Sequence, residues 1–506
     1  MGDFHRGPAM IESLLAGFEA AFTLVNLAFI AAGITLGILI GAIPGLGSVT
    51  ALAILIPITF YMSPLPAIAF LVGVNKGGTS GGAIPAILLN SPGTPEAAAS
   101  AFDGYPMTQR GEAKRAMKYA LYSSVTGDMI SDVLLIILVV PFAAVALQFG
   151  PLEYTAILIF AFSLLAGISS ASPTKGLIAI FGGVFLSTIG LDPVDSTQRM
   201  TFDQVNLYDG LSISAVAIGC LALASVIEQM FDLRRQQSAS AEAGQSGQHG
   251  PTALTVGEFF SHWKTIGRSA LIGSGVGMLP GLGVTLAAFL SYGAAKRASA
   301  EPQSFGKGNP QGIIATEAAN SAVVGANLVP TIALGVPGNI AAALLIGAFI
   351  IHGIVPGPFM MTMHGELIYA LFASMLMANG VHLVIGKLGI PLWSLVAKTP
   401  KSVILPPVLI LCIVGVYLPG QSLFDVGVML AFAGVGLAMR RTGFPVVCLV
   451  IGFLLGGMLE TSLRQSLLLH KSDLSALLGS PIALVFLALT VFVLLRAFRR
   501  TPKENA

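Results

Sequence analysis

"PAILLNSPGT", from Pro85 to Thr94, returns 245 positions later as "PTIALGVPGN", from Pro330 to Asn339. Both copies lie in strongly apolar surroundings, where proline removes a backbone hydrogen-bond donor and glycine weakens a helix. The shared proline followed by a Pro-Gly pair predicts two short helical pieces that meet at an unwound turn. Non-helical backbone at membrane depth persists only where protein or a water-filled cavity satisfies its polar groups. We therefore expect each turn to line a polar site.

The composition is that of a membrane protein. The 506 residues are 55% hydrophobic and 10% charged, with mean hydropathy +0.84, whereas soluble domains carry about a quarter charged residues. A membrane span needs about 20 apolar residues, and the chain has about ten such stretches besides shorter interrupted ones. The fold class predicted is an all-α polytopic membrane protein with about 10–12 membrane segments plus hairpins.

Several functions are disfavoured. A net charge of +2 gives no reason to expect a nucleic-acid partner. The chain has no phosphate-binding G-x-x-x-x-G-K-[ST] motif, and its seven histidines show no metal-ligand spacing. Cys220, Cys412 and Cys448 lie unpaired in apolar stretches, which favours a packing role. We therefore expect a protein that is not an enzyme, with no cofactor and no metal beyond a transported sodium ion.

A second motif, G-x-x-P-G-L-G, is also duplicated, at residues 41–47 and 277–283. Between the halves lies a small, polar stretch without periodicity, which is typical of a flexible linker. We predict a first membrane repeat over 1–233, a linker over 234–254 and a second repeat over 255–480. The remainder, 481–506, is predicted to be an added helix with a basic tail.

The distribution of Lys and Arg, which mark cytoplasmic loops, is reversed between the halves. Two loops lack Lys and Arg. In the first half this is "YMSPLP", which lies between the two motifs, and in the second half it is "HGIVPGPFMMTMHGE", which follows the second motif. The basic loops at the opposite places contain Lys296, Arg297 and Lys307 in the second half and Arg110, Lys114, Arg115 and Lys118 in the first. This pattern predicts two inverted-topology repeats with broken or re-entrant helices, as in secondary transporters.

The polar residues around the turns are the candidate site. Unwound turns expose carbonyls that hold a cation, and helix N-termini favour an anion. The predicted substrate-binding residues are Lys76, Thr79, Ser80, Asn90, Ser91, Pro92, Gly93, Thr94, Asn327, Thr331, Pro337, Gly338 and Asn339. The predicted structural loop residues are Gly41, Pro44, Gly45, Gly47, Gly277, Pro280, Gly281 and Gly283. The alternative is that Pro and Gly merely kink packed helices, which Ser, Thr and Asn join.

Charged residues within apolar stretches are usually functional. Lys76 is predicted to face an anionic substrate, or else to extend from a hairpin tip to the interface. Asp128 and Asp132 share a helix face and either couple a cation or lie near water or pair with Lys. The full set of candidate cation-coupling residues is Ser48, Thr50, Asn320, Ser321, Thr285, Asp128 and Asp132. Glu228 and Glu460 close the two halves and are assigned structural roles, with Arg464 in position for an i,i+4 ion pair with Glu460.

The sequence resembles the large membrane subunit of the tripartite tricarboxylate transporters. The matching pieces include "GAIPGLG", "GGAIPAILLNSPGTPEAAASAFDGYPMTQRGEAKRAM", "GLDPVDSTQRMTFDQVNLYDG", "GMLPGLG", "NLVPTIALGVPGN" and "GGMLETSLRQSLLLHKSD". The resemblance implies a multi-pass permease of the bacterial inner membrane, surrounded by lipid, that takes up citrate or related carboxylates by a sodium or proton gradient. It also implies a small four-helix membrane subunit and a periplasmic solute-binding protein as partners.

The residues alone reach a secondary transporter with inverted repeats and an anion-compatible central site. Together with the resemblance, they lead us to expect alternating access, in which one unit moves relative to the other. The alternative is a substrate-selective channel whose re-entrant loops act as a filter.

Overall fold

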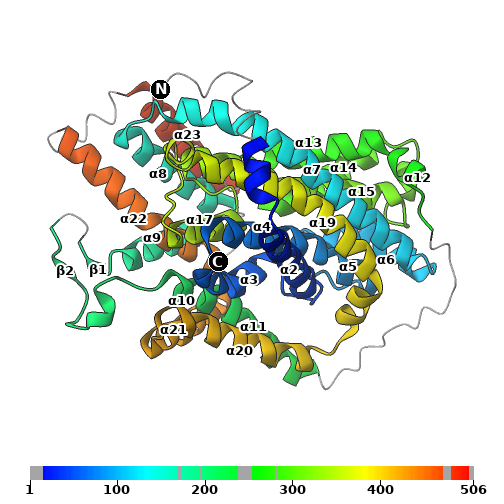
Figure 1. Cartoon of the computed structure of the whole chain (residues 1–506), viewed down its shortest axis with the longest axis horizontal. Coiled ribbons are helices and arrows are strands. Elements are labelled where there is room, and N and C mark those ends of the chain that lie inside the picture. Colours follow the sequence, from blue (N-terminus) through cyan, green and yellow to red (C-terminus); the bar gives the residue numbers. More distant parts are fainter. Residues whose placement is uncertain are drawn as a thin grey trace.

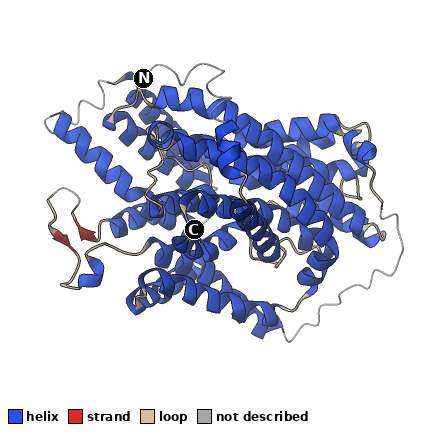
Figure 2. Cartoon of the chain, in the orientation of Figure 1, coloured by secondary structure: helices blue, strands red, loops and turns tan. Residues whose placement is uncertain are grey.

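The protein is described by a computed structural model that covers residues 15–168, 172–192, 195–236, 253–279, 283–470 and 480–500. These residues are almost wholly helical (Figure 2). Nine helices in the described ranges are long and apolar enough to cross a membrane, and four shorter apolar helices accompany them. The prediction of an all-α polytopic membrane protein is confirmed. Pro280, Gly281 and most of the predicted linker lie outside the described residues.

The first half contains α2 (Leu24–Gly41), α3 (Ser48–Leu55), η1 (Ile56–Tyr61), α4 (Pro64–Gly81), α5 (Ala83–Leu89), α6 (Ala98–Gln109), α7 (Ala113–Ala146), α8 (Pro151–Ile168), α9 (Pro173–Ser187), η2 (Val205–Leu207), α10 (Ile213–Ala217), η3 (Ile218–Leu223) and α11 (Ala224–Gln236). Two short strands, β1 (Gly190–Leu191) and β2 (Gln198–Arg199), pair antiparallel within the loop that precedes η2.

The second half contains α12 (Val256–Phe260), α13 (Trp263–Gly277), α14 (Gly283–Ala298), η4 (Pro302–Ser304), α15 (Pro310–Ala326), α16 (Leu328–Leu334), α17 (Ile340–Ile351), α18 (Met360–Met363), α19 (Gly365–Lys398), α20 (Lys401–Gly420), α21 (Leu423–Arg441) and α22 (Val446–Leu469). The added helix, α23 (Pro481–Arg500), packs against α8.

Close backbone contacts show that α2 and α4 run in the same direction. A Cβ atom at Gly33 of α2 would collide with the carbonyl oxygen of Phe70 in α4, and one at Gly41 with that of Gly78. Because both residue numbers rise together, the intervening α3 and η1 must return the chain across the same depth. The G-x-x-P-G-L-G segment therefore begins a returning hairpin.

The second half repeats this packing. A Cβ atom at Gly273 of α13 would collide with the carbonyl oxygen of Ala319 in α15, and one at Gly277 would lie 3.2 Å from that of Val323. The helices α13, α14 and α15 thus correspond to α2, α3 and α4. The repeat is visible in the packing, whereas the inversion of one half relative to the other stays a prediction.

The long helices cross between the halves. Figure 1 shows α7 beside α15 and α19 beside α2 and α4. Gly127 of α7 packs on the backbone of Ala318 in α15, and the side-chain amide of Asn26 in α2 donates to Ser374 of α19 at 2.9 Å. The same exchange occurs farther along the chain, where α9 packs on α22 and η3 on α21. Each half therefore depends on the other for the packing of its own core.

The ends of the halves are held by ion pairs. Glu460 accepts from Arg464 at 3.1 Å, as the i,i+4 spacing predicts, and Glu228 pairs with Arg440 of α21 at 2.9 Å. Arg464 also donates to Asp192, next to β1, at 2.8 Å. These contacts support the structural roles assigned to the two glutamates.

Glu258 of α12 links the start of the second half to α7 of the first half through hydrogen bonds and an ion pair. Its carboxylate accepts from the Tyr119 hydroxyl at 2.7 Å and from Arg115, both on α7. The hydrogen bond from Arg115, followed by that from Tyr119, lowers the pKa of Glu258 below its ordinary value. Because the pKa of Glu258 is lower in the folded state than in the unfolded state, its ionised carboxylate stabilises the fold at pH values above the unfolded-state pKa. That stabilisation is lost as the pH falls through the folded-state pKa.

We expect Gly183→Ala to destabilise the protein by about 1–3 kcal/mol, because the new methyl group would overlap the carbonyl oxygen of Leu449 in α22. Gly182→Ala is the matched control, since no heavy atom lies within 4 Å of the added Cβ atom. Thermal unfolding of both variants in the same detergent measures the difference. Equal unfolding temperatures for the two variants would contradict this account of the contact between α9 and α22.

Candidate functional site

The two Pro-Gly turns share one backbone design. Asn90 ends α5 with φ 50°, and its repeat counterpart Gly335 ends α16 with φ 67°. The N–H of Ser91 donates to the Pro85 carbonyl, and that of Val336 to the Pro330 carbonyl, both at 3.3 Å. In each turn a left-handed residue ends the helix and a hydrogen bond reaches back to the last helical turn, and proline commonly follows such a helix end. The predicted pair of short helices at an unwound turn is confirmed in both halves.

The glycine of each Pro-Gly pair allows a close approach. A Cβ atom at Gly93 would lie 2.8 Å from the carbonyl oxygen of Gly41, and one at Gly338 would lie 2.7 Å from that of Gly277. Each turn therefore rests on the first glycine of the G-x-x-P-G-L-G motif of its own half. Thr94 also contacts the position that a Cβ atom of Gly47 would take.

The remaining predicted residues near the G-x-x-P-G-L-G motifs are loop glycines and prolines and three candidate cation-coupling residues. Gly45 has φ 85° and Gly283 has φ 76°, which favour glycine, and Pro44 precedes the first of these. Ser48 and Thr50 are buried in the first turn of α3. Thr285 in α14 donates to Glu96, just past the first Pro-Gly turn, at 3.4 Å.

The two turns differ in exposure. Asn90 and Ser91 are exposed and Pro92 is half-buried, whereas the residues from Gly335 through Pro337 to Asn339 are buried. Each turn packs against its own half, and no hydrogen bond among the described residues links the two.

Buried polar groups surround the second turn. Asn339 caps the N-terminus of α17 by accepting from the Ala342 N–H at 2.8 Å. Asn327, on which Gly338 packs, is fully buried, and neither its side-chain nitrogen nor its side-chain oxygen has a hydrogen-bond partner among the described residues. Thr331 donates to the Asn327 carbonyl at 2.7 Å. A buried amide without partners costs free energy, so the Asn327 side chain is under-satisfied in the state described.

Lys76 is fully buried between three helices. Its ammonium donates to Asp132 of α7 and to Asn379 of α19, both at 2.9 Å, and lies 3.4 Å from Asp128. The Asn379 amide in turn donates to Asp132 at 2.7 Å. The alternative that Lys76 extends to the interface is wrong, because its side chain has no exposed surface. Of the roles predicted for Asp128 and Asp132, the structure shows pairing with a lysine.

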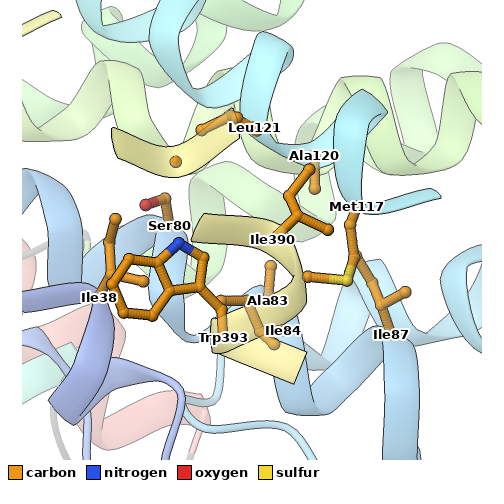
Figure 3. A pocket seen from close by; sticks show the side chains of 11 residues that line it. Ile38, Ser80, Ala83, Ile84, Ile87, Met117, Ala120, Leu121, Ile390 and Trp393 are labelled. Atoms are coloured by element: carbon orange, nitrogen blue, oxygen red, sulfur yellow. The ribbon is translucent and has the colours of Figure 1, made fainter. Parts of the chain in front are cut away.

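A polar chain leads from this cluster to a small cavity. The ring of His382 in α19 lies 2.7 Å from the Ser80 hydroxyl and 4.0 Å from Asp128. Figure 3 shows Ser80 at the edge of a cavity lined mainly by apolar side chains such as Ile38 and Trp393. Its volume of about 30 Å³ suits roughly one water molecule and not a tricarboxylate. Thr79, the neighbour of Ser80, is buried in α4.

Sequence reasoning missed Glu317, which lies in α15 with no exposed surface. Its carboxylate accepts from Ser100 of α6 and, at 3.3 Å, from Ser124 of α7. The signal was present, because Glu317 is the only Asp, Glu, Lys or Arg between Lys307 and Glu366. The predicted cation residues Asn320 and Ser321 follow it on the same helix and are also fully buried.

Residues 27–451 match the tripartite tricarboxylate transporter TctA family. The chain belongs to this family. The predicted resemblance is confirmed, and the protein is a multi-pass inner-membrane component of tripartite tricarboxylate transport.

Two relatives of this TctA-family protein come from Agrobacterium vitis. An "Uncharacterized 52.8 kDa protein in TAR-I ttuC' 3'region" is 33% identical over 479 residues, which cover 95% of this chain and 94% of the relative. An "Uncharacterized protein in TAR-II ttuC' 3'region" is 34% identical over 217 residues, which cover 43% of this chain and 90% of the relative. No solved structure matches the chain.

In the Lys76 cluster one ammonium faces two buried carboxylates, those of Asp128 and Asp132. Lys76→Met leaves two buried carboxylates without a cation and should destabilise the protein by about 3–5 kcal/mol. Asp132→Asn leaves Lys76 balanced by Asp128 at 3.4 Å and should cost clearly less. Thermal unfolding of the two variants in one detergent compares them. If Asp132→Asn proves the more damaging, the charge-balance account of this cluster fails.

Proposed function

We propose that this TctA-family subunit takes up tricarboxylates or related organic acids, driven by an ion gradient, through alternating access. The observation that carries the proposal is the pair of Pro-Gly turns, each built alike and each resting on its own G-x-x-P-G-L-G motif. Interrupted helices in corresponding positions of two repeats are typical of binding sites in secondary transporters. The subunit acts as a transporter rather than as an enzyme.

Carboxylate recognition is proposed to use neutral donors near the second turn. Asn339 holds the N-terminal end of α17, where free N–H groups and the helix dipole favour an anion. The unpartnered amide of Asn327 lies against the same turn. The exposed Asn90 and Ser91 of the first turn are proposed to meet the substrate from the other half.

Lys76 is proposed to have a structural role rather than to contact the substrate first. Its ammonium is engaged by Asp132 and Asn379 in the state described. A substrate carboxylate would have to displace one of these partners, so we assign contact with the substrate first to the turns. The cluster is proposed to hold α4, α7 and α19 in one of the two alternating states.

The partners are also proposals. A tripartite family implies that other proteins complete the system. We propose a small four-helix membrane subunit beside this chain and a periplasmic solute-binding protein that delivers the substrate. Substrate choice among citrate and other carboxylates would then reside largely in the binding protein.

The decisive experiment is uptake into proteoliposomes that contain this subunit and its small partner, with labelled citrate and added binding protein. Sodium and proton gradients are imposed in turn. We expect accumulation that requires both a gradient and the binding protein. Flux that only equilibrates, indifferent to gradients and binding protein, would indicate a channel and contradict the proposal.

A substitution in the same assay tests the turns. Asn327→Ala removes an amide that makes no hydrogen bond in the structure, so we expect the unfolding temperature to change little. We expect uptake to fall by at least tenfold, because a site built to hydrogen-bond its substrate loses that contact. Asn309→Ala, in the loop before α15, is the control for loss of an Asn that only supports structure.

A further inference from the structure

Glu317 lies where the two halves meet. It belongs to α15 of the second half, whereas the hydroxyls that it accepts from, Ser100 and Ser124, belong to α6 and α7 of the first. Ser100 is in the first turn of α6, directly after the first Pro-Gly turn. A ligand held at Glu317 would therefore connect the second half to the end of that turn.

The carboxylate of Glu317 is not balanced by a cation from any residue that the structure describes. Within the described residues no Lys, Arg or His side chain lies within ion-pairing distance of it. A buried carboxylate is costly unless it is paired and hydrogen-bonded. Two serine hydroxyls supply hydrogen bonds but no positive charge.

Two other buried carboxylates have partners that offset the free-energy cost of burial. Asp132 accepts from the ammonium of Lys76. Asp103, also fully buried, accepts three backbone N–H groups at 2.8 Å, from Gly306, Gly308 and Asn309, and the Tyr292 hydroxyl at 2.9 Å. Among the described residues, Glu317 has neither an ammonium nor a set of backbone donors, only the two serine hydroxyls.

The groups beside Glu317 are oxygen ligands. Asn320 and Ser321 follow by three and four residues on α15, which places them on the same helix face. Both are fully buried; among the described residues the Ser321 hydroxyl has no hydrogen-bond partner, and the Asn320 carboxamide, which lies beside the Glu317 carboxylate, makes no hydrogen bond of standard geometry. Hard cations prefer carboxylate, carbonyl and hydroxyl oxygens, and a single carboxylate charge matches a monovalent ion.

We propose that Glu317, together with Ser100, Ser124 and Asn320, binds one sodium ion. The inference rests on the proposed function in that it gives the coupling ion a site. It also assigns Lys76, Asp128 and Asp132 a different role, because an ammonium already occupies the space between those two carboxylates. Sodium at Glu317 would bring α6, α7 and α15 together at the end of the first Pro-Gly turn.

The test measures sodium binding without transport. The full chain in detergent is unfolded thermally in increasing NaCl, with KCl added to keep the ionic strength constant. A ligand that binds only the folded state raises the unfolding temperature with its concentration. We expect sodium to raise the unfolding temperature of the natural protein and of the control Glu301→Gln, whose side chain is exposed, but not that of Glu317→Gln.

Ser124→Ala is the second variant, and it keeps the test decisive if Glu317→Gln does not fold. We expect it to need several-fold more sodium for the same shift in unfolding temperature. A sodium response that persists unchanged in Glu317→Gln, or in Ser124→Ala where Glu317→Gln does not fold, would overturn the site. So would a natural protein that responds to pH but not to sodium, since the occupant would then be a proton. Because no uptake is measured, loss of transport cannot be mistaken for loss of this site.

Discussion

Two close contacts between a glycine and a carbonyl oxygen hold the two Pro-Gly turns in place. Gly93 lies on the carbonyl of Gly41, and Gly338 lies on that of Gly277. Backbone that leaves the helix in a membrane must be supported by protein or by water. Each Pro-Gly turn meets this constraint by reaching back to its preceding helix and by packing on the glycine motif of its own half. The parallel pairs of helices are held by further contacts of the same kind, such as Gly41 on the carbonyl of Gly78 and Gly273 on that of Ala319.

Much of this arrangement could be predicted because it is encoded locally. The position of Asn90 and Gly335 before a Pro-Gly pair determines a helix end whatever surrounds it. Duplication of both motifs showed the repeat. The composition was sufficient for the membrane class.

What could not be predicted depends on partners far apart in sequence. Asn379 and His382 meet Lys76 and Asp128 only because α19 of the second half packs on α4 and near α7 of the first. No short-range pattern reports such an exchange of helices. Glu317 is different, since its charge within an apolar stretch was visible in the sequence. Its lack of a cation became apparent only when its neighbours were known.

The central claim is that both Pro-Gly turns line one substrate path. Thr94 and Asn339 occupy equivalent positions in the two turns, and each is 8% exposed. The direct measurement is the rate at which a small thiol reagent labels single cysteines at these positions, with and without citrate and binding protein. The native Cys220, Cys412 and Cys448 are all buried. The account predicts that substrate slows labelling at both positions, and protection of only one position, or of neither, would contradict it.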